Sequence, residues 1–141
     1  MEKGLFSLSE IDDYFSAWNN LPNGSVVEDG NYMDLFKSSD AMILDSISFI
    51  SEYMYTEKPL LFLCKEKNIL KKWFNEYGQM TVKQLYEAHS WEDIEHFIDD
   101  VVIRGNDPLN EQRVRIVNDV LKWTSKPACE NIIEHLKGVL Q

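Results

Sequence analysis

The pattern of apolar and polar positions predicts a strand–helix–strand unit in the middle of the chain. Residues 41–44 (Ala-Met-Ile-Leu) and 60–64 (Leu-Leu-Phe-Leu-Cys) are short apolar runs, typical of strands buried on both faces of a parallel sheet. The residues between them predict a helix, which Lys58-Pro59 ends because a residue before proline disfavours the α conformation. The apolar stripe of this helix consists of Phe49, Ile50, Tyr53 and Met54. The connection fits a right-handed crossover between two parallel strands.

The sequence before this unit predicts two helices and a strand. Ser7 and Glu10 have the spacing of a capping box, and the apolar residues that follow recur at helical spacing until Pro22. Residues 25–27 (Ser-Val-Val) favour a short strand. Asn31 is suited to cap a brief second helix.

Beyond the second apolar run the pattern is helical to the end of the chain. Residues 81–86 fit a short helix, and Ser90 is placed to cap a longer one. Asp107 and Pro108 suit the N-cap and first position of the next helix, and Pro127 precedes the last. We therefore expect an α/β fold, partial and Rossmann-like, with three layers, a small parallel sheet of three strands and a helical C-terminal third. Three strands are few for a doubly wound domain, so the fold resembles part of one.

Composition narrows the class of protein. A chain of 141 residues, 44% of them hydrophobic, is expected to form a single domain (residues 1–141) with a well-developed core. Its net charge of −10 repels nucleic acids and anionic membrane surfaces, so nucleic acid is not an expected partner. No apolar run is long enough to cross a bilayer, the N-terminus lacks the pattern of a signal peptide, and the two cysteines suit a reducing compartment. We expect a cytoplasmic protein without a transmembrane segment.

Four lysines follow the second predicted strand. Glutamates at positions 66 and 76 dilute the positive charge of this group, which consists of Lys65, Lys67, Lys71 and Lys72. The group fits an ordinary solvated helix face, or an edge that steers phosphate towards a site.

The turn after the first predicted strand carries the most specific candidate chemistry. Asp45, Ser46 and Ser48 stand where a strand leads into a helix, and ligands of open α/β sheets bind at the carboxyl ends of strands. A helix N-terminus there attracts anions, so Ser46 and Ser48 could donate hydrogen bonds to a diphosphate while Asp45 orients the turn. Glu52, one turn further, could accept hydrogen bonds from hydroxyls of a bound ribose or glycerol. The alternative is that Asp45 and the serines only cap the helix, which these residue types favour without any ligand.

Residues 31–63 resemble the donor-binding region of GT-B-type transferases. The closest resemblance is to the CDP-glycerol glycerophosphotransferase family, which builds teichoic-acid and capsule polymers. Glu52 stands where that family often has aspartate, and the matching positions are Asp40, Asp45, Ser48, Tyr53, Lys58 and Pro59. A related corner in UDP-sugar 2-epimerases corresponds to Asp45, Ser46 and Glu52, which gives a weaker, isomerase-like alternative.

Two departures from the family pattern bear on the expected activity. Ile47 separates Ser46 from Ser48, where the family has adjacent serines, and Leu44 stands where a hydroxyl residue is common. The chain also lacks the acceptor domain that completes the cleft of a GT-B enzyme, and none of its three histidines precedes Asp45. The resemblance therefore implies a donor-binding fragment that is inactive by itself or depends on a partner.

The expected ligand is a nucleotide-diphosphate donor, CDP-glycerol or a nucleotide-sugar. No catalytic residue is assigned, and no cofactor is expected. Because a three-stranded sheet leaves exposed edges, we expect a homodimer or a partner chain to cover one of them. The alternative in a different class is a degenerate interaction module that keeps the fold and has lost the ligand.

A metal site is not expected from the sequence. His89 and His96 would lie two helical turns apart, roughly 10 Å, which is too far for one zinc ion. Glu92 and His96 are better explained as an ordinary surface pair one turn apart.

Overall fold

The computed structural model describes residues 6–27, 30–66, 74–122 and 126–140. The chain divides into two compact units, Met1–Asp34 and Leu35–Gln141. The single domain expected from the sequence stays a prediction.

The N-terminal unit contains helix α1 (Leu8–Asn19). Its predicted capping box is confirmed: the Glu10 amide donates to the Ser7 hydroxyl, and the Ser7 amide donates to the Glu10 carboxylate at 2.8 Å. These bonds from the Ser7 backbone and side chain lower the pKa of the Glu10 carboxyl. None of the residues of α1 is buried. Its apolar face therefore lies open in the part of the chain that the structure describes.

The strand predicted at residues 25–27 does not form. The Val26 amide donates a hydrogen bond to the Asn19 side chain at 3.3 Å, and Val27 is 54% exposed. β-branched residues favour a strand where a neighbouring strand accepts hydrogen bonds from their amides. Here the Asn19 side chain accepts the hydrogen bond from Val26 instead. Helix α2 (Tyr32–Ser38) follows, as predicted, and crosses the boundary between the units.

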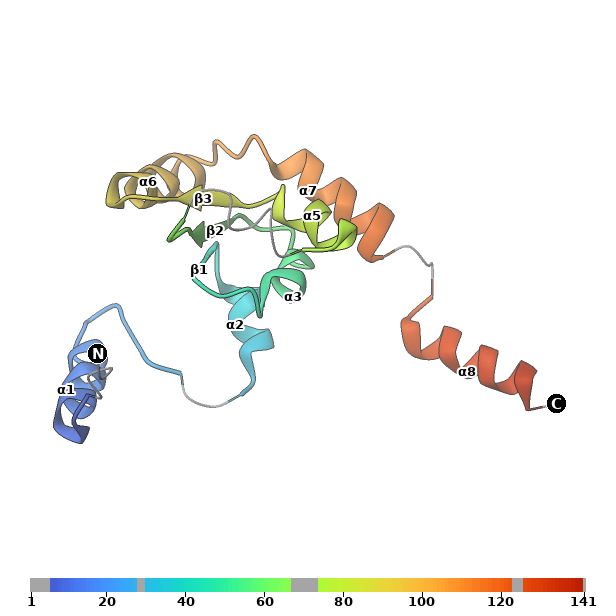
Figure 1. Ribbon diagram of the computed structural model, residues 1–141, viewed down its shortest axis with the longest axis horizontal. Helices are drawn as coiled ribbons and strands as arrows, with labels where there is room; N and C mark the ends of the chain where they lie inside the picture. Colours follow the sequence, from blue (N-terminus) through green and yellow to red (C-terminus); the bar gives the residue numbers. More distant parts are fainter. Residues whose placement is uncertain (1–5, 28–29, 67–73, 123–125, 141) are drawn as a thin grey trace. The chain divides into compact units, whose positions relative to one another are not determined.

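The second unit is built around a parallel sheet in the order β1-β2-β3 (Figure 1). The strands are β1 (Met42–Leu44), β2 (Leu60–Leu63) and β3 (Tyr86–Ala88). β1 and β2 are the two predicted apolar runs, and helix α3 (Ile50–Met54) joins them. The predicted crossover between parallel strands is thus confirmed, and so is a mixed α/β fold with a small sheet.

The third strand is not where the sequence predicts it. Residues 81–86 were expected to be helical, whereas the helix is α5 (Glu76–Val82) and Tyr86 begins β3. β3 pairs in parallel with β2, with Leu61 opposite Tyr86 and Leu63 opposite Ala88. Tyr-Glu-Ala is not a strongly apolar segment, so its strand conformation follows from pairing with β2 rather than from local preference.

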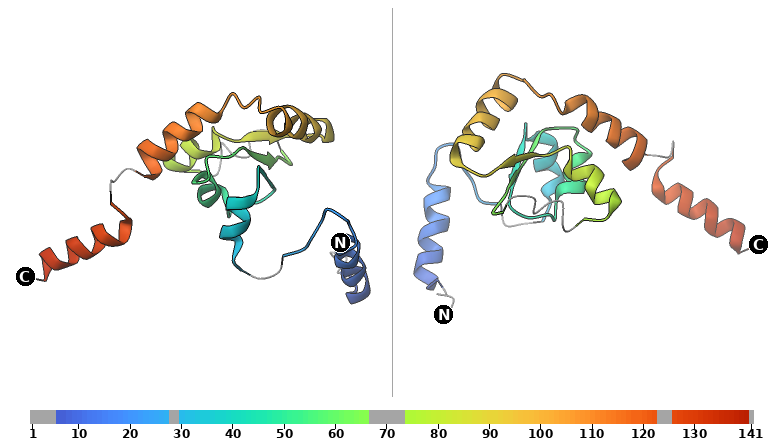
Figure 2. Two further views of the ribbon diagram at one scale, coloured as in Figure 1. Left: turned by 180° about the vertical axis from the view of Figure 1, so that it is seen from behind. Right: turned by 45° about the horizontal axis from the view of Figure 1, so that its top comes forward.

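Both faces of β2 are buried. Leu61 packs in a cluster with Ala88, Phe97 and Val101, which brings helix α6 (Trp91–His96) and the π-helix η1 (Phe97–Ile103) against one face. Leu60 and Phe62, which point to the other face because strand side chains alternate, are also buried. Figure 2 shows α6 beside β3 from two further directions.

Helices complete the chain. Helix α7 (Asn110–Ile116) continues into the π-helix η2 (Val117–Leu121), and α8 (Ala128–Val139) follows Pro127 as predicted. Asp107 and Pro108 do not begin α7, because its N-cap is Leu109. The Asp107 side chain is engaged instead by Tyr86 and Arg113.

No helix in the described ranges is both long enough and apolar enough to span a bilayer. Of the four lysines singled out in the sequence, Lys67, Lys71 and Lys72 lie outside the described residues.

Candidate functional site

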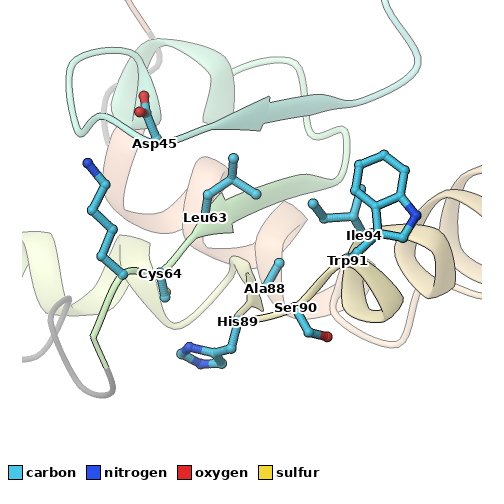
Figure 3. A pocket seen from close by; sticks show the side chains of 9 residues that line it. Asp45, Leu63, Cys64, Ala88, His89, Ser90, Trp91 and Ile94 are labelled. Atoms are coloured by element: carbon cyan, nitrogen blue, oxygen red, sulfur yellow. The ribbon is translucent and has the colours of Figure 1, made fainter.

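A cavity of about 380 Å³ lies at the carboxyl ends of all three strands (Figure 3). Asp45 follows β1, Cys64 and Lys65 follow β2, and His89 and Ser90 follow β3. The remaining lining residues are Leu63, Ala88, Trp91 and Ile94. This edge of a parallel sheet is the usual place for a ligand, and the volume is within the range of small-molecule sites.

Strand register brings these residues together. Leu63 lies opposite Ala88, and the Cys64 amide donates a hydrogen bond to the Ala88 carbonyl at 2.8 Å. The residues that follow therefore emerge side by side, although more than 20 positions separate them in the sequence.

The predicted cap at Ser90 fixes one wall of the cavity. The Asp93 amide donates to the Ser90 hydroxyl, and the Asp93 carboxylate accepts from the amides of His89 at 2.8 Å and Ser90 at 3.0 Å. These hydrogen bonds, chiefly that from the His89 backbone, lower the pKa of the Asp93 carboxyl. α6 therefore begins at a defined residue, and Trp91 at its first position stands 67% exposed at the cavity.

Charges of both signs line the cavity. Lys65 brings an ammonium group and Asp45 a carboxylate, and both residues are exposed. The Trp91 indole is held by a hydrogen bond from its Nε1 to Glu95 at 2.8 Å. Such a lining offers a cation, hydrogen-bond acceptors and a flat aromatic surface to a ligand.

Of the four site residues predicted from the sequence, Asp45 lines the cavity. Ser46, Ser48 and Glu52 are exposed and are not part of its lining. Within the turn itself, the Ser48 amide donates to the Ser46 hydroxyl at 3.3 Å. The two serines thus lie close together beside the residue that reaches the cavity.

Neither Asp45 nor the serines are the N-cap of α3. α3 begins at Ile50, and its N-cap is Phe49, with no side-chain capping hydrogen bond. The turn of residues 45–48 lies directly before the N-cap Phe49, and within it the Ser46 hydroxyl accepts a hydrogen bond from the Ser48 amide.

Two other residues of the resemblance have structural roles. The Lys58 ammonium donates to the carbonyls of Phe36 and Lys37 in the last turn of α2 and of Ser39 just beyond it. A cation there stabilises the end of a helix. Tyr53 is fully buried, and its hydroxyl is hydrogen-bonded to Ser39 at 3.0 Å.

Cys64, Glu87 and His89 form a cluster that the sequence analysis did not identify. Glu87 Oε2 lies 3.9 Å from Cys64 Sγ and 3.5 Å from His89 Nε2. Burial, with the Glu87 carboxylate adding to it, raises the pKa of the Cys64 thiol to about 11. No spacing in the sequence signals this group, because β2 and β3 bring it together and β3 was not predicted.

The comparisons with known proteins identify no relative. No family model matches the chain, and neither a curated protein nor a solved structure is significantly similar to it. The function is therefore inferred from the geometry of this site together with the resemblance in residues 31–63.

Proposed function

We propose that the cavity binds the diphosphate of a nucleotide-diphosphate donor, CDP-glycerol or a nucleotide-sugar. The chain would then be the donor-binding part of a GT-B-type glycerophospho- or glycosyltransferase that builds a cell-envelope polymer. The observation that carries the proposal is the position of the cavity at the carboxyl ends of β1, β2 and β3, with Asp45 and Lys65 in its lining. The three-layer arrangement of a GT-B donor domain belongs to the same proposal.

Lys65 and the polar residues at and after the end of β1 have distinct roles in this proposal. The Lys65 ammonium neutralises diphosphate charge, as a compact cation does at many phosphate sites. The Ser46 hydroxyl has a hydrogen to donate, since it accepts from the Ser48 amide. The Ser48 hydroxyl takes part in no hydrogen bond with the described residues, so it is available to the donor. Asp45 orients the turn, and Glu52 accepts hydrogen bonds from hydroxyls of the donor.

The proposal assigns binding to this chain, and catalysis to a complete assembly. Transfer from a diphosphate requires stabilisation of the departing phosphate, which fixed hydrogen-bond donors and cations supply. The acceptor and a general base would come from a second domain or a partner. We expect the purified chain to bind the donor without turning it over.

Calorimetric titration tests the proposed binding. CDP-glycerol, UDP-N-acetylglucosamine, CDP and pyrophosphate are titrated into the wild-type chain and into Lys65→Ala and Ser48→Ala. A charge-assisted hydrogen bond contributes about 1.5–3 kcal/mol, so Lys65→Ala should weaken binding about tenfold or more. Lys83→Ala, which also removes one positive charge from an exposed position, is the matched control and should bind like the wild type.

The outcomes separate the two classes of function. Binding that Lys65→Ala and Ser48→Ala weaken and Lys83→Ala leaves unchanged supports the donor site. Absence of binding to all four ligands at millimolar concentration would contradict it.

A specific observation favours the second candidate, an interaction module. Helices α1 and α8 are amphipathic, and neither buries a residue in the described structure. The exposed apolar residues of α8 are Ile132, Ile133, Leu136 and Val139. Exposed apolar faces of this kind mark interaction surfaces, and a titration without any nucleotide binding would leave this function in place.

A further inference from the structure

We propose that Cys64, Glu87 and His89 bind a divalent transition-metal ion, with Zn²⁺ as the ion their chemistry favours. Each residue offers one ligand atom, and the three atoms lie within 4.8 Å of one another. The inference is independent of the proposed donor binding. It differs from the expectation from sequence, which considered His89 with His96 and found them too far apart.

The distances between the ligand atoms fit a tetrahedral ion. Bonds of about 2.0–2.3 Å to zinc place neighbouring ligands of a tetrahedron roughly 3.3–3.8 Å apart. The observed distances are 3.5 Å from Glu87 Oε2 to His89 Nε2 and 3.9 Å from Glu87 Oε2 to Cys64 Sγ. The third pair, Cys64 Sγ and a ring nitrogen of His89, lies within 4.8 Å, and the proposal requires side-chain rotation to bring the three atoms to tetrahedral spacing.

The sheet holds the three residues on one face. Glu87 and His89 are alternate residues of β3 and its extension, on either side of Ala88, which packs into the cluster with Leu61 and Phe97. Side chains alternate along a strand, so Glu87 and His89 point away from that cluster. Phe62 lies opposite Glu87 in the register, and Cys64, two residues further, belongs to the same face.

The types of ligand select the ion. A thiol, an imidazole and a carboxylate suit zinc, whereas magnesium and calcium prefer oxygen ligands alone. Among the described residues, the only salt bridge of Glu87 is with His89, so no lysine or arginine neutralises this carboxylate in the place of a metal. A divalent ion would add positive charge beside this carboxylate.

Three protein ligands leave the fourth position of a tetrahedral ion open. Cys64 and His89 also line the cavity at the carboxyl ends of the strands, and Figure 3 shows both beside it. An open position is the property that distinguishes reactive zinc sites from closed structural ones. The fourth ligand is expected to be water or a group of a molecule in the cavity.

Cobalt binding tests the site directly. The purified full chain, freed of metal with a chelator, is titrated with Co²⁺ alone. We expect one Co²⁺ per chain, with an absorption band from charge transfer between the thiolate and the cobalt, and Zn²⁺ should abolish the band. His89→Gln should weaken Co²⁺ binding about tenfold or more, since even partners outside the coordination shell contribute that much.

The chain contains a matched control for the thiol and for the imidazole ligand. Cys129 and His135 are the corresponding residues of α8, and both are exposed. Cys129→Ser and His135→Gln should keep the band and the affinity. His89 is exposed, so His89→Gln should keep the wild-type circular dichroism spectrum, and this variant decides the test without a substitution at the half-buried Cys64. Absence of the band, or binding that Cys129→Ser abolishes and His89→Gln does not, would overturn the proposal.

Discussion

At the scale of single residues, Arg113 forms a buried polar contact that joins separate parts of the fold. Its side chain is fully buried, its guanidinium pairs with the Asp107 carboxylate, and its Nε donates to the Glu57 carbonyl at 2.9 Å. Glu57 has a left-handed backbone, with φ of 62°, which a residue with a side chain rarely adopts. Arg113 thus links α7 to the loop that joins α3 to β2.

Removal of Arg113 should be strongly destabilising. Arg113→Ala leaves the partly buried Asp107 carboxylate without its cation, and breaking such a pair costs about 3–5 kcal/mol. We expect a loss of that size in the free energy of unfolding, measured in urea. Arg115→Ala changes an exposed arginine of the same helix and should stay within about 0.5 kcal/mol of the wild type. Equal effects of the two substitutions would refute the structural role of Arg113.

Tyr86 should make stability depend on alkaline pH. Burial, and then the hydrogen bond to Asp107 and the charge of that carboxylate, raise the pKa of the Tyr86 phenol above its ordinary value of 10.0. The folded chain therefore keeps a proton that the unfolded chain loses, so the stabilisation is complete below pH 10 and declines as the pH rises further. Burial also raises the pKa of the Tyr53 phenol.

The measurement is the free energy of unfolding of wild type and Tyr86→Phe on both sides of pH 10. The variant lacks the titrating phenol, so its stability should fall less steeply above pH 10. The variant should keep part of the pH dependence, because the raised pKa of Tyr53 also makes stability decline as the pH rises. Parallel pH profiles for the two proteins would count against the assignment.

At the scale of elements, α6 begins with a side-chain cap and α3 does not, and this difference should appear in the free energy of unfolding of variants. Ser90 caps α6 through its hydroxyl, so Ser90→Ala should lower the free energy of unfolding by about 1 kcal/mol. Ser48 does not cap α3, so Ser48→Ala should change it by less than about 0.5 kcal/mol. Chemical denaturation of both variants tests this, and a large loss in Ser48→Ala would mean that the turn has a structural role after all.

The elements that sequence analysis predicted share a strong local signal. β1 and β2 are continuous apolar runs, and α1 and α6 begin with side-chain caps. β3 was missed because Tyr86-Glu87-Ala88 carries no such signal and becomes a strand by pairing with β2. Residues 25–27 carry a local strand signal, the pair Val26-Val27, but they have no partner strand among the described residues and stay irregular.

The start of α7 was missed for a related reason. Asp107 and Pro108 fit a helix start by residue type, but Asp107 is held by Tyr86, 21 residues earlier, and by the buried Arg113. Arg113 itself gave no sign of burial, because arginine is rarely buried unless it is paired. Tertiary contacts therefore decide both features.

At the scale of the whole molecule, the site could be predicted only in part. The crossover between β1 and β2 predicts that Asp45 lies at the carboxyl edge of the sheet, and Asp45 lines the cavity there. The other side of the cavity, with His89, Ser90 and Trp91, depends on β3 and was not predicted. The Cys64–Glu87–His89 cluster depends on the same strand pairing and could not be inferred without it.

The most direct test of the central proposal is to map donor binding on the chain by nuclear magnetic resonance. Amide chemical shifts of the full chain are recorded while CDP-glycerol is added. The account predicts shifts at the ends of all three strands, at Asp45–Ser48, Cys64–Lys65 and His89–Trp91, and none in α8. Shifts confined to other segments, or none at millimolar ligand, would contradict a donor site at this edge of the sheet.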